Sequence, residues 1–469
     1  MVQLVEDRDL CALGAAELAL RIAAGRVRAI EVLDAQLARI EERNGALGAV
    51  VSLDVDGARR HALETDDALA AGRRIGPLHG VPITLKDGND VAGLRTTIGT
   101  HELDNVPAKD GAVAARLRAA GANIIGHSNV AAWLADHQSA NPVFGRTSNP
   151  WDPSRTSGGS SGGAAAAVAS GMTPFDVGSD LVGSLRQPAS FCGVYALKTT
   201  EHRVPLTGFF RTPDGAPRPL RIMLNLGPLA RDLDDLELAL SVISGPDGFD
   251  GDVPPVPLTR RDPRAPGDLR IAVAPTIPGA PVAKVLRDKV DQVAGAISDA
   301  GGQVREALPE ISWQQQGELF GELIQMLTSV VTPDGADLRL ARYLELLSRR
   351  DELIGCWERF FEQYDALLMP PAATVAYPHC APGTPLALDG GQIAYHEQGF
   401  VFALASLSGL PALVMPAGLD GGGLPAGIQL VGARWTEPLL LAIGRGLDNA
   451  EITPGFRPPP AESPAEAPG

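Results

Sequence analysis

Apolar residues recur at helical spacing near the start of the chain and later gather into short runs between helical segments. Ile30, Leu33, Leu37 and Ile40 lie three or four positions apart and predict an amphipathic helix, with Gly45 as its stop signal. The apolar runs that predict buried strands are GAVVSL, GVPITLKD, DLRIAVAP, YDALLMPP, PALVMPAG and AGIQLVGA. Buried strands interleaved with helices indicate a layered α/β fold with a large mixed, largely parallel central sheet.

No linker of convincing length divides this pattern, so a single domain is predicted for residues 1–454. Within it, the region of about 200–361 is expected to be a peripheral cap or insertion. It contains a Pro-rich stretch at 245–268 that is typical of a surface loop, and a helical, apolar-rich stretch at 311–361 that we interpret as a cap over a site. Residues 455–469 are too rich in Pro, Ala and acids to pack, so a disordered tail is expected there.

Composition indicates a soluble globular protein with no surface for nucleic acid. Of 469 residues, 45% are apolar and 20% are charged, and the formal charge of −16 comes from acids scattered along the chain. The N-terminus places acids where a signal peptide needs a basic region, so a cytoplasmic location is expected. The uncharged run at 400–419 is long enough to span a membrane, but Gly409, Pro411 and Pro416 break it and favour a buried helix followed by a buried strand. The four cysteines lack the paired spacing of a zinc site.

The segment RTSGGSSGGAAAAVASG at 155–171 places serines and glycines ahead of an alanine run. A flexible linker should join two domains, whereas this segment leads into a helix-like stretch. A phosphate loop requires a lysine after the glycines, and none follows. The letters match a nucleophile elbow, G-x-S-x-G, but an elbow must follow a buried strand and the preceding NPWDPSRTS is loop-like.

A second serine segment, GSDLVGSLRQPASFCG at 178–193, places Gly183 directly before Ser184. A glycine beside a nucleophile leaves room for a substrate carbonyl to approach backbone N–H groups, as an oxyanion hole requires. A serine nucleophile needs a base, and Lys86 closes the apolar strand GVPITLK. Burial there would lower its pKa towards neutrality and let it act as that base, whereas an ion pair with Asp87 is the purely structural alternative.

Three segments in this order, GVPITLKDGNDVAG, NPWDPSRTSGGSSGG and GSDLVGSLRQPASFCG, closely resemble the amidase signature family, and the resemblance extends from about residue 8 to 450. It implies one α/β/α domain without cofactor or metal. It also implies a Ser–Ser–Lys triad with Ser184 as nucleophile, Ser160 as bridging serine and Lys86 as base. In the family the bridging serine follows a cis peptide bond, which would here join Gly159 to Ser160.

The reaction that the resemblance implies is acyl transfer through an acyl-enzyme. Ser184 loses its proton to Lys86 through Ser160 and attacks the carbonyl, and water later releases the acyl group. The oxyanion would be held by backbone N–H groups near Leu181, Val182, Gly183 and Ser184. Supporting roles are assigned to Gly159, Asp180 and Arg186, and Ser161 is interpreted as structural.

This chain departs from the family beside the nucleophile. The family usually has threonine and glycine at the positions of Leu181 and Val182, so the larger side chains should narrow or reshape the acyl pocket. Aromatic residues that could complete an apolar pocket are Trp133, Phe209, Phe210, Trp313 and Phe320. Such walls favour aryl or alkyl amides.

Two alternatives remain open for the function. Carbamates and esters share the carbonyl geometry, so urethane or ester cleavage would use the same triad. The chain could instead be the A subunit of a glutamyl-tRNA amidotransferase, which belongs to the same family and would show little activity alone. The partner otherwise expected is a small-molecule amide or carbamate, bound by a monomer or homodimer, with neither nucleic acid nor a membrane as partner.

Overall fold

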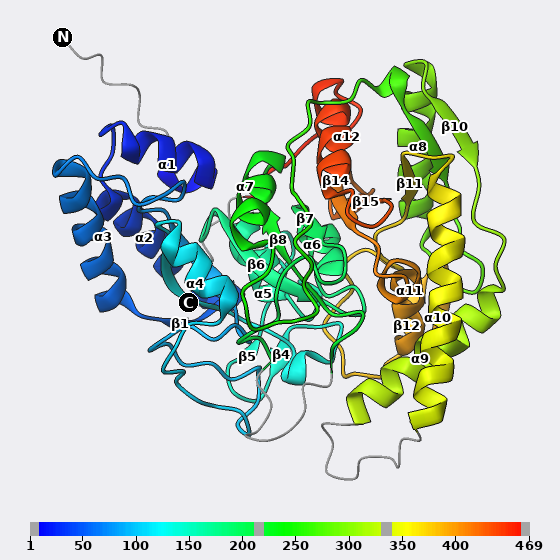
Figure 1. Cartoon of the computed structure of the whole chain (residues 1–469), viewed down its shortest axis with the longest axis horizontal. Helices are drawn as coiled ribbons and strands as arrows, with labels where there is room; N and C mark the ends of the chain where they lie inside the picture. Colours follow the sequence, from blue (N-terminus) through cyan, green and yellow to red (C-terminus); the bar gives the residue numbers. More distant parts are fainter. Residues whose placement is uncertain (1–8, 211–219, 330–339, 461–469) are drawn as a thin grey trace, which may run out of the picture.

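The structure is a computed structural model that describes residues 9–210, 220–329 and 340–460. A long sheet runs through the molecule, a smaller sheet lies near the N-terminal helices, and helices surround both (Figure 1). The strands of the long sheet are β6 (Phe175–Asp180), β7 (Tyr195–Lys198), β8 (Asn225–Ala230), β9 (Arg270–Val273), β10 (Gln303–Glu306), β11 (Ala366–Met369), β14 (Ala412–Leu419) and β15 (Pro425–Val431). The smaller sheet contains β1 (Val50–Leu53), β3 (Asn123–Ser128) and β2 (Pro82–Lys86), in that order.

Helices cover both faces of the long sheet, and for this reason the residues of β6, β7, β8, β11 and β15 are all buried. The helices are α1 (Ala15–Ala23), α2 (Ala29–Leu47), α3 (Val55–Ala70), α4 (Ala112–Ala119), α5 (Gly162–Ala169), α6 (Arg186–Cys192), α7 (Leu233–Ile243), α8 (Lys284–Asp299), α9 (Trp313–Ser329), α10 (Leu340–Phe361), α11 (Phe400–Leu407) and α12 (Glu437–Asn449). Short paired strands, β4 (Ala140–Asn141) with β5 (Gly145–Arg146) and β12 (Leu386–Leu388) with β13 (Gly391–Ile393), lie outside the two sheets.

The long sheet has the strand order β10–β9–β11–β15–β14–β7–β8–β6. The prediction of a mixed α/β sheet is confirmed, but the expectation that it is largely parallel is wrong. Among the described strands of the long sheet, β9 pairs in parallel with β10 and with β11, and the other neighbours are antiparallel. A strand covered on both faces is a continuous apolar run whatever its direction, so the apolar pattern could not distinguish the two.

The first predicted helix is longer than its sequence pattern indicated. The helix α2 continues through Gly45 and ends at Gly48, whose φ of +59° is left-handed and whose N–H donates to the carbonyl of Asn44. The uncharged run at 400–419 forms the buried helix α11 followed by the buried strand β14, as predicted. Among the described residues, no helix is both long and apolar enough to cross a bilayer.

Residues 200–361 do not form one peripheral unit, contrary to expectation. The strands β8, β9 and β10 from this region all belong to the long sheet, where β8 is completely buried, β9 is buried at three of its four positions, and the polar β10 lies mostly exposed at the edge. The stretch at 245–268 does lie mostly outside helices and strands, and the described residues of 311–361 form α9 and α10, which pack against each other. The end of the domain at 454 remains a prediction, because most of the predicted tail, residues 461–469, lies outside the described residues.

A buried ion pair joins α10 to the sheet. Arg350 donates from Nη2 to Oε2 of Glu201 at 2.7 Å and from Nε to the carbonyl of Leu407 at 2.7 Å. Burial would by itself raise the pKa of Glu201, but hydrogen bonding to His202 and the charge of Arg350 lower it to about 2. The contact fixes the helical pair α9–α10 next to the end of α11, and thereby places α9 beside the candidate site.

Replacing Arg350 with methionine should reduce the free energy of unfolding by about 3 kcal/mol, because the Glu201 carboxylate stays buried after losing this cation. Urea unfolding at pH 7 measures the change. Arg349→Met is the matched control, since this neighbouring guanidinium makes no hydrogen bond or salt bridge with the described residues; we expect less than about 0.5 kcal/mol there. Equal losses in the two variants would show that the ion pair does not anchor the helix.

Candidate active site

Lys86 is the centre of a cluster of three serine hydroxyls. It is the last residue of β2 and is completely buried. Its Nζ lies 2.7 Å from Oγ of Ser160, 2.8 Å from Oγ of Ser161 and 2.9 Å from Oγ of Ser179. Ser160 and Ser161 directly precede α5, whereas Ser179 is on β6, the edge strand of the long sheet that packs against β2. Two sheets therefore meet at this amine.

The environment of Lys86 favours its neutral form. Burial lowers the pKa of Lys86 to about 7, although the charges of Asp180, Asp176 and Asp87 oppose the shift. No described carboxylate comes within salt-bridge distance of its Nζ, which excludes the ion pair with Asp87 as the structural alternative. A neutral amine has two protons to donate and one lone pair, so one of the three hydroxyls can then donate to Nζ. Lys86 is thus able to take a proton from a serine.

Two of the three nearby carboxylates, Asp87 and Asp176, are held by threonine side chains. Asp87 accepts hydrogen bonds from the amide and hydroxyl of Thr97. Asp176 accepts one from the hydroxyl of Thr84 at 2.7 Å, and burial raises the pKa of Asp176 to about 6. Their charges act on Lys86 through space only, which agrees with a base that can lose its proton near neutral pH.

Ser184 lies in the turn between β6 and α6, on the wall of the same cavity as Ser160 and Ser179. Gly183 before it has a φ of +85°, and a Cβ there would lie 2.4 Å from the ring of Phe402, so the turn requires glycine. The Ser184 hydroxyl is half-buried and makes no hydrogen bond within the described chain. The structure thus shows the contact between Lys86 and Ser160 but no hydrogen bond between the hydroxyls of Ser160 and Ser184.

Asp180 organises the turn that carries Ser184. Its carboxylate accepts hydrogen bonds from the amides of Gly183 at 2.9 Å and Leu185 at 3.1 Å, and from Nε and Nη2 of Arg186 at 3.0 and 2.8 Å. Although burial would raise the pKa of Asp180, the charge and hydrogen bonds of Arg186 lower it to about 2. The guanidinium also lies 4.9 Å from the centre of the Phe402 ring. The supporting positions of Asp180 and Arg186 therefore shape the loop.

The amide of Gly183 is engaged by Asp180, so it does not point to a substrate oxyanion in this structure. The amides of Leu181, Val182 and Ser184 have no acceptor within the described residues and are the donors that could hold one. The predicted set of four is thereby reduced to three in this arrangement.

Ser160 follows a cis peptide bond from Gly159. A Cβ at Gly159 would come within 2.5 Å of the carbonyl oxygen of Asp136 and 2.6 Å of the amide nitrogen of Gln138. Glycine is therefore required because the segment 136–138 packs directly against the backbone that carries Ser160. The helix α5, all of whose residues are buried, follows at once and holds this backbone in place.

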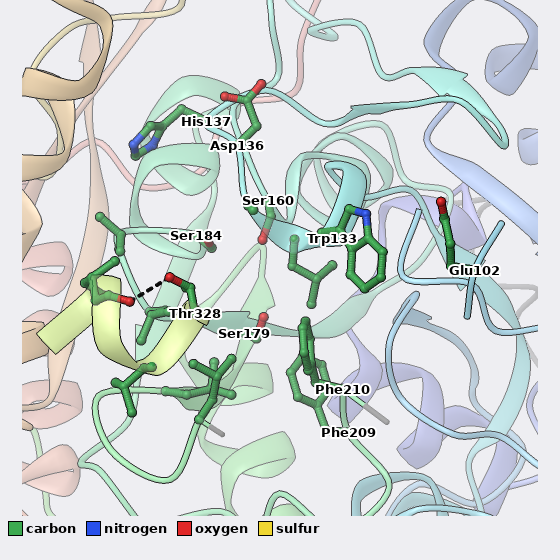
Figure 2. A pocket seen from close by; sticks show the side chains of 18 residues that line it. Glu102, Trp133, Asp136, His137, Ser160, Ser179, Ser184, Phe209, Phe210 and Thr328 are labelled. Atoms are coloured by element: carbon green, nitrogen blue, oxygen red, sulfur yellow. Dashed lines mark hydrogen bonds between the residues drawn. The ribbon is translucent and has the colours of Figure 1, made fainter. Parts of the chain in front are cut away.

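A cavity of about 690 Å³ opens over the three serines Ser160, Ser179 and Ser184 (Figure 2). Its apolar walls include Trp133, Phe209, Phe210, Leu220, Ile324 and Leu327. The side chains of Leu181 and Val182 also line it, as predicted from their size. Polar groups on the wall include Glu102, Asp136, His137 and Thr328. No three His, Cys, Asp or Glu side chains in the described ranges are close enough together to hold a metal ion.

The chain matches the Amidase family over residues 31–320 and 323–441. It belongs to the amidase family. The A subunit of the glutamyl-tRNA(Gln) amidotransferase of Roseiflexus sp. (strain RS-1) is 33% identical, over 90% of this chain and 92% of its own. An acylamidase of Rhodococcus erythropolis is 30% identical, over 97% and 99% of the two chains. A solved structure, described as a vestigial protein complex that reveals the origins of an s-triazine catabolic enzyme, superposes with a TM-score of 0.82 at 27% identity, over 94% and 99% of the chains. The protein is an amide-hydrolysing enzyme of this family.

Three of the five aromatic residues proposed for the amidase pocket line the cavity: Trp133, Phe209 and Phe210. Trp313 and Phe320 do not, because the cavity meets only the last turns of α9, at Ile324, Leu327 and Thr328. At about 1.5 Å per residue, Trp313 lies roughly 16 Å further along the helix axis from Ile324. Phe320 is buried in the core instead.

Sequence reasoning missed Ser179 and understated Ser161 in the amidase site. Both hydroxyls contact the amine of Lys86, at the same distances as Ser160 within 0.2 Å. Ser161 could have been found from its position next to Ser160. Ser179 could not, because its role arises from the packing of β6 against β2, two strands from different sheets.

Lys86→Met should become more stable relative to the natural amidase as the pH falls from about 10 to about 7. In that interval the unfolded lysine binds a proton that the buried one does not, so the natural protein loses roughly 1.4 kcal/mol of unfolding free energy for each pH unit. Below about pH 7 both states bind the proton and the difference becomes constant. Urea unfolding of both proteins at pH 6, 7, 8 and 9 measures it.

The difference between the unfolding free energies of the two proteins cancels the contributions of every titratable group that they share. Lys284→Met is the control, because its side chain is 69% exposed and removal of its charge should give a difference that hardly varies over this range. A Lys86→Met difference independent of pH would contradict a buried amine that loses its proton near neutrality.

Proposed function

We propose that the protein is a serine hydrolase that cleaves the C–N bond of apolar aryl or alkyl amides through a Ser184 acyl-enzyme. The observation that carries the proposal is the amine of Lys86, which has no carboxylate partner among the described residues and contacts the hydroxyl of Ser160. Ser160 and Ser184 line the same cavity. A neutral lysine in contact with a serine can act as a base, and that serine can relay a proton from a second serine.

The reaction would begin with transfer of the Ser184 proton to Ser160, while Ser160 passes its own proton to Lys86. The Ser184 oxygen then bonds to the amide carbon, and the resulting oxyanion accepts hydrogen bonds from the amides of Leu181, Val182 and Ser184. As the C–N bond breaks, the proton on Lys86 returns through Ser160 to the leaving amine. Water repeats the sequence on the ester and releases the acid.

The apolar cavity wall favours the binding of apolar amides over that of small polar ones. Burying apolar substrate area contributes roughly 25 cal/mol per Å², and the aromatic side chains Trp133, Phe209 and Phe210 supply such area. Carbamates and esters present the same carbonyl to Ser184 and are the second candidate substrates. The similarity to a component of a tRNA amidotransferase supports a third possibility, a role within such a complex, but the apolar side chains of Leu181 and Val182 on the cavity wall disfavour free glutamine.

Ser184→Ala should lower kcat/KM for an aryl amide by at least about 10³-fold, because the other two serine hydroxyls on the cavity wall, those of Ser160 and Ser179, are bonded to the amine of Lys86. The measurement is product release from a matched aryl amide, aryl carbamate and aryl ester, by the natural protein and the variant. Ser241→Ala, an exposed serine far from the cavity, is the control and should retain full turnover. Amide turnover that survives Ser184→Ala would rule out this nucleophile, and no turnover in the natural protein would favour the role within an amidotransferase complex.

The pH dependence of kcat/KM should show a limb that rises through about pH 7, because Lys86 must lose its proton before it can accept one from Ser160. Above that pH the rate should level off. Asp176→Asn removes a negative charge that raises the pKa of Lys86, so the limb should move to lower pH, by up to about one unit. Asp152→Asn, at the surface, is the control. If the limb does not move in Asp176→Asn, the titrating group is not Lys86.

A further inference from the structure

The cavity has two chemically different ends with the catalytic serines between them. In Figure 2, Phe209 and Phe210 lie on one side of Ser160 and Ser184, and the side chains of Asp136 and His137 lie on the opposite side. Attack by a serine divides an amide at its carbonyl into an acyl half and an amine half. With the reacting serines in the middle, a bound amide places one half towards the aromatic end and the other towards Asp136 and His137.

Asp136 is held in place by a chain of buried and partly buried hydrogen bonds. The hydroxyl of Tyr395 donates to its Oδ1 at 2.7 Å, and Nε2 of Gln138 donates to that hydroxyl at 3.1 Å. Because the tyrosine oxygen accepts from Gln138, its single proton is committed to Asp136. Gln138 is itself paired with the backbone of Cys380, through its Nε2 at 2.8 Å and its Oε1 at 3.2 Å. The second oxygen, Oδ2, accepts no hydrogen bond from the described residues.

His137 completes the polar end and is fixed to the nucleophile turn. Its ring stacks on Phe402, with centroids 6.1 Å apart and planes inclined by 24°, and it meets Tyr395 edge-on at 6.3 Å. The Phe402 ring is the one that packs on Gly183, directly before Ser184. Burial lowers the pKa of His137, so a neutral imidazole stands beside Asp136 near pH 7. The polar end therefore carries one carboxylate, not a compensated ion pair.

The position of this end relative to the reacting serines is also fixed. The backbone of 136–138 packs against Gly159 so closely that a Cβ there would overlap it, and Ser160 follows directly. Pre-organised groups bind a ligand more tightly because less ordering is needed on binding. A substrate group that reaches Asp136 is therefore aligned with the scissile carbonyl.

We propose, building on the amide hydrolysis proposed above, that Asp136 selects amides whose half opposite the aromatic end bears a primary ammonium group. A partly buried carboxylate with a free oxygen forms a strong charge-assisted hydrogen bond with such a group. The same carboxylate repels a substrate carboxylate, and Glu102 adds a second negative charge to the cavity wall. The substrate class is an amphipathic amide, apolar on one side of the C–N bond and cationic on the other.

The test uses amides of equal length that share an aromatic half and differ in the terminal group of the other half: ammonium, hydroxyl or carboxylate. Two series are needed because either half can be the acyl side: anilides of 4-aminobutanoic, 4-hydroxybutanoic and butanedioic acid, and phenylacetamides of 1,2-diaminoethane, 2-aminoethanol and glycine. In at least one series, kcat/KM should be about tenfold higher for ammonium than for hydroxyl, and at least about tenfold lower again for carboxylate.

The variant Asp136→Asn should reduce the ammonium-to-hydroxyl ratio to near one, because the amide keeps the shape and loses the charge. Glu397→Gln is the matched control: this residue is on the same short helix as Tyr395 and outside the cavity wall, so its ratio should stay at the natural value. Tyr395→Phe, which removes the donor to Asp136, should lower the ratio in part.

The outcomes separate this inference from the function on which it rests. Equal kcat/KM for the ammonium and hydroxyl substrates in the natural protein, or a ratio that Asp136→Asn leaves intact, overturns the role of Asp136 while hydrolysis itself stands. Hydrolysis of every substrate by Ser184→Ala would instead overturn the proposed nucleophile. A fall in the ratio that occurs equally in Glu397→Gln would mean that overall charge, rather than Asp136, sets the preference.

Discussion

The burial of one amine without a counter-ion is the constraint on which the site depends. Lys86 ends a strand whose residues are all buried, and its nitrogen meets three hydroxyls instead of a carboxylate. Hydroxyls satisfy the hydrogen bonding of an amine in either protonation state, whereas a carboxylate in contact would hold the proton. The position of Lys86 at the junction of two sheets is what makes this arrangement possible, because the small sheet supplies the lysine, the long sheet supplies Ser179, and the segment before α5 supplies Ser160 and Ser161.

The turn that carries Ser184 holds a buried charge pair close to Lys86, and the negative charge of Asp180 raises the pKa of that lysine. Asp180 is five-fold engaged by backbone amides and the guanidinium of Arg186, and the pair is completely buried. A carboxylate so fully satisfied perturbs a nearby amine less than a free one would, because its charge is largely balanced by the guanidinium. Asp180 also accepts the hydrogen bond of the Gly183 amide, whereas the amides of Val182 and Ser184 have no acceptor among the described residues.

The sequence allowed the elements and the contiguous motifs to be predicted, but not contacts between distant segments. Strand and helix positions followed from apolar runs, and the expectation of Lys86, Ser160 and Ser184 came from three contiguous segments, because each of these signals is local. Strand direction did not follow, since both faces of the sheet are covered. Ser179 joins the lysine cluster only through packing of β6 on β2, and Tyr395 reaches Asp136 across 259 positions. Only the C-terminal end of α9 reaches the cavity. Ile324 and Leu327 therefore line the cavity, while Trp313, at the other end of the helix, does not.

The residues around Lys86 and much of the cavity wall come from different segments of the chain, so substrate preference and reactivity can change separately. Lys86 and the three serines in contact with it belong to buried strands and to the start of a buried helix, so a change there disturbs the core as well as the hydrogen bonds of the amine. The cavity walls come from elsewhere: the end of α9, the aromatic pair at 209–210 and the segment 133–137. Only the last of these also packs against the backbone of Ser160, through Gly159. A substitution on α9 can therefore alter which apolar group fits without moving the serines, whereas a shift of the segment around Asp136 would be felt at Ser160 itself.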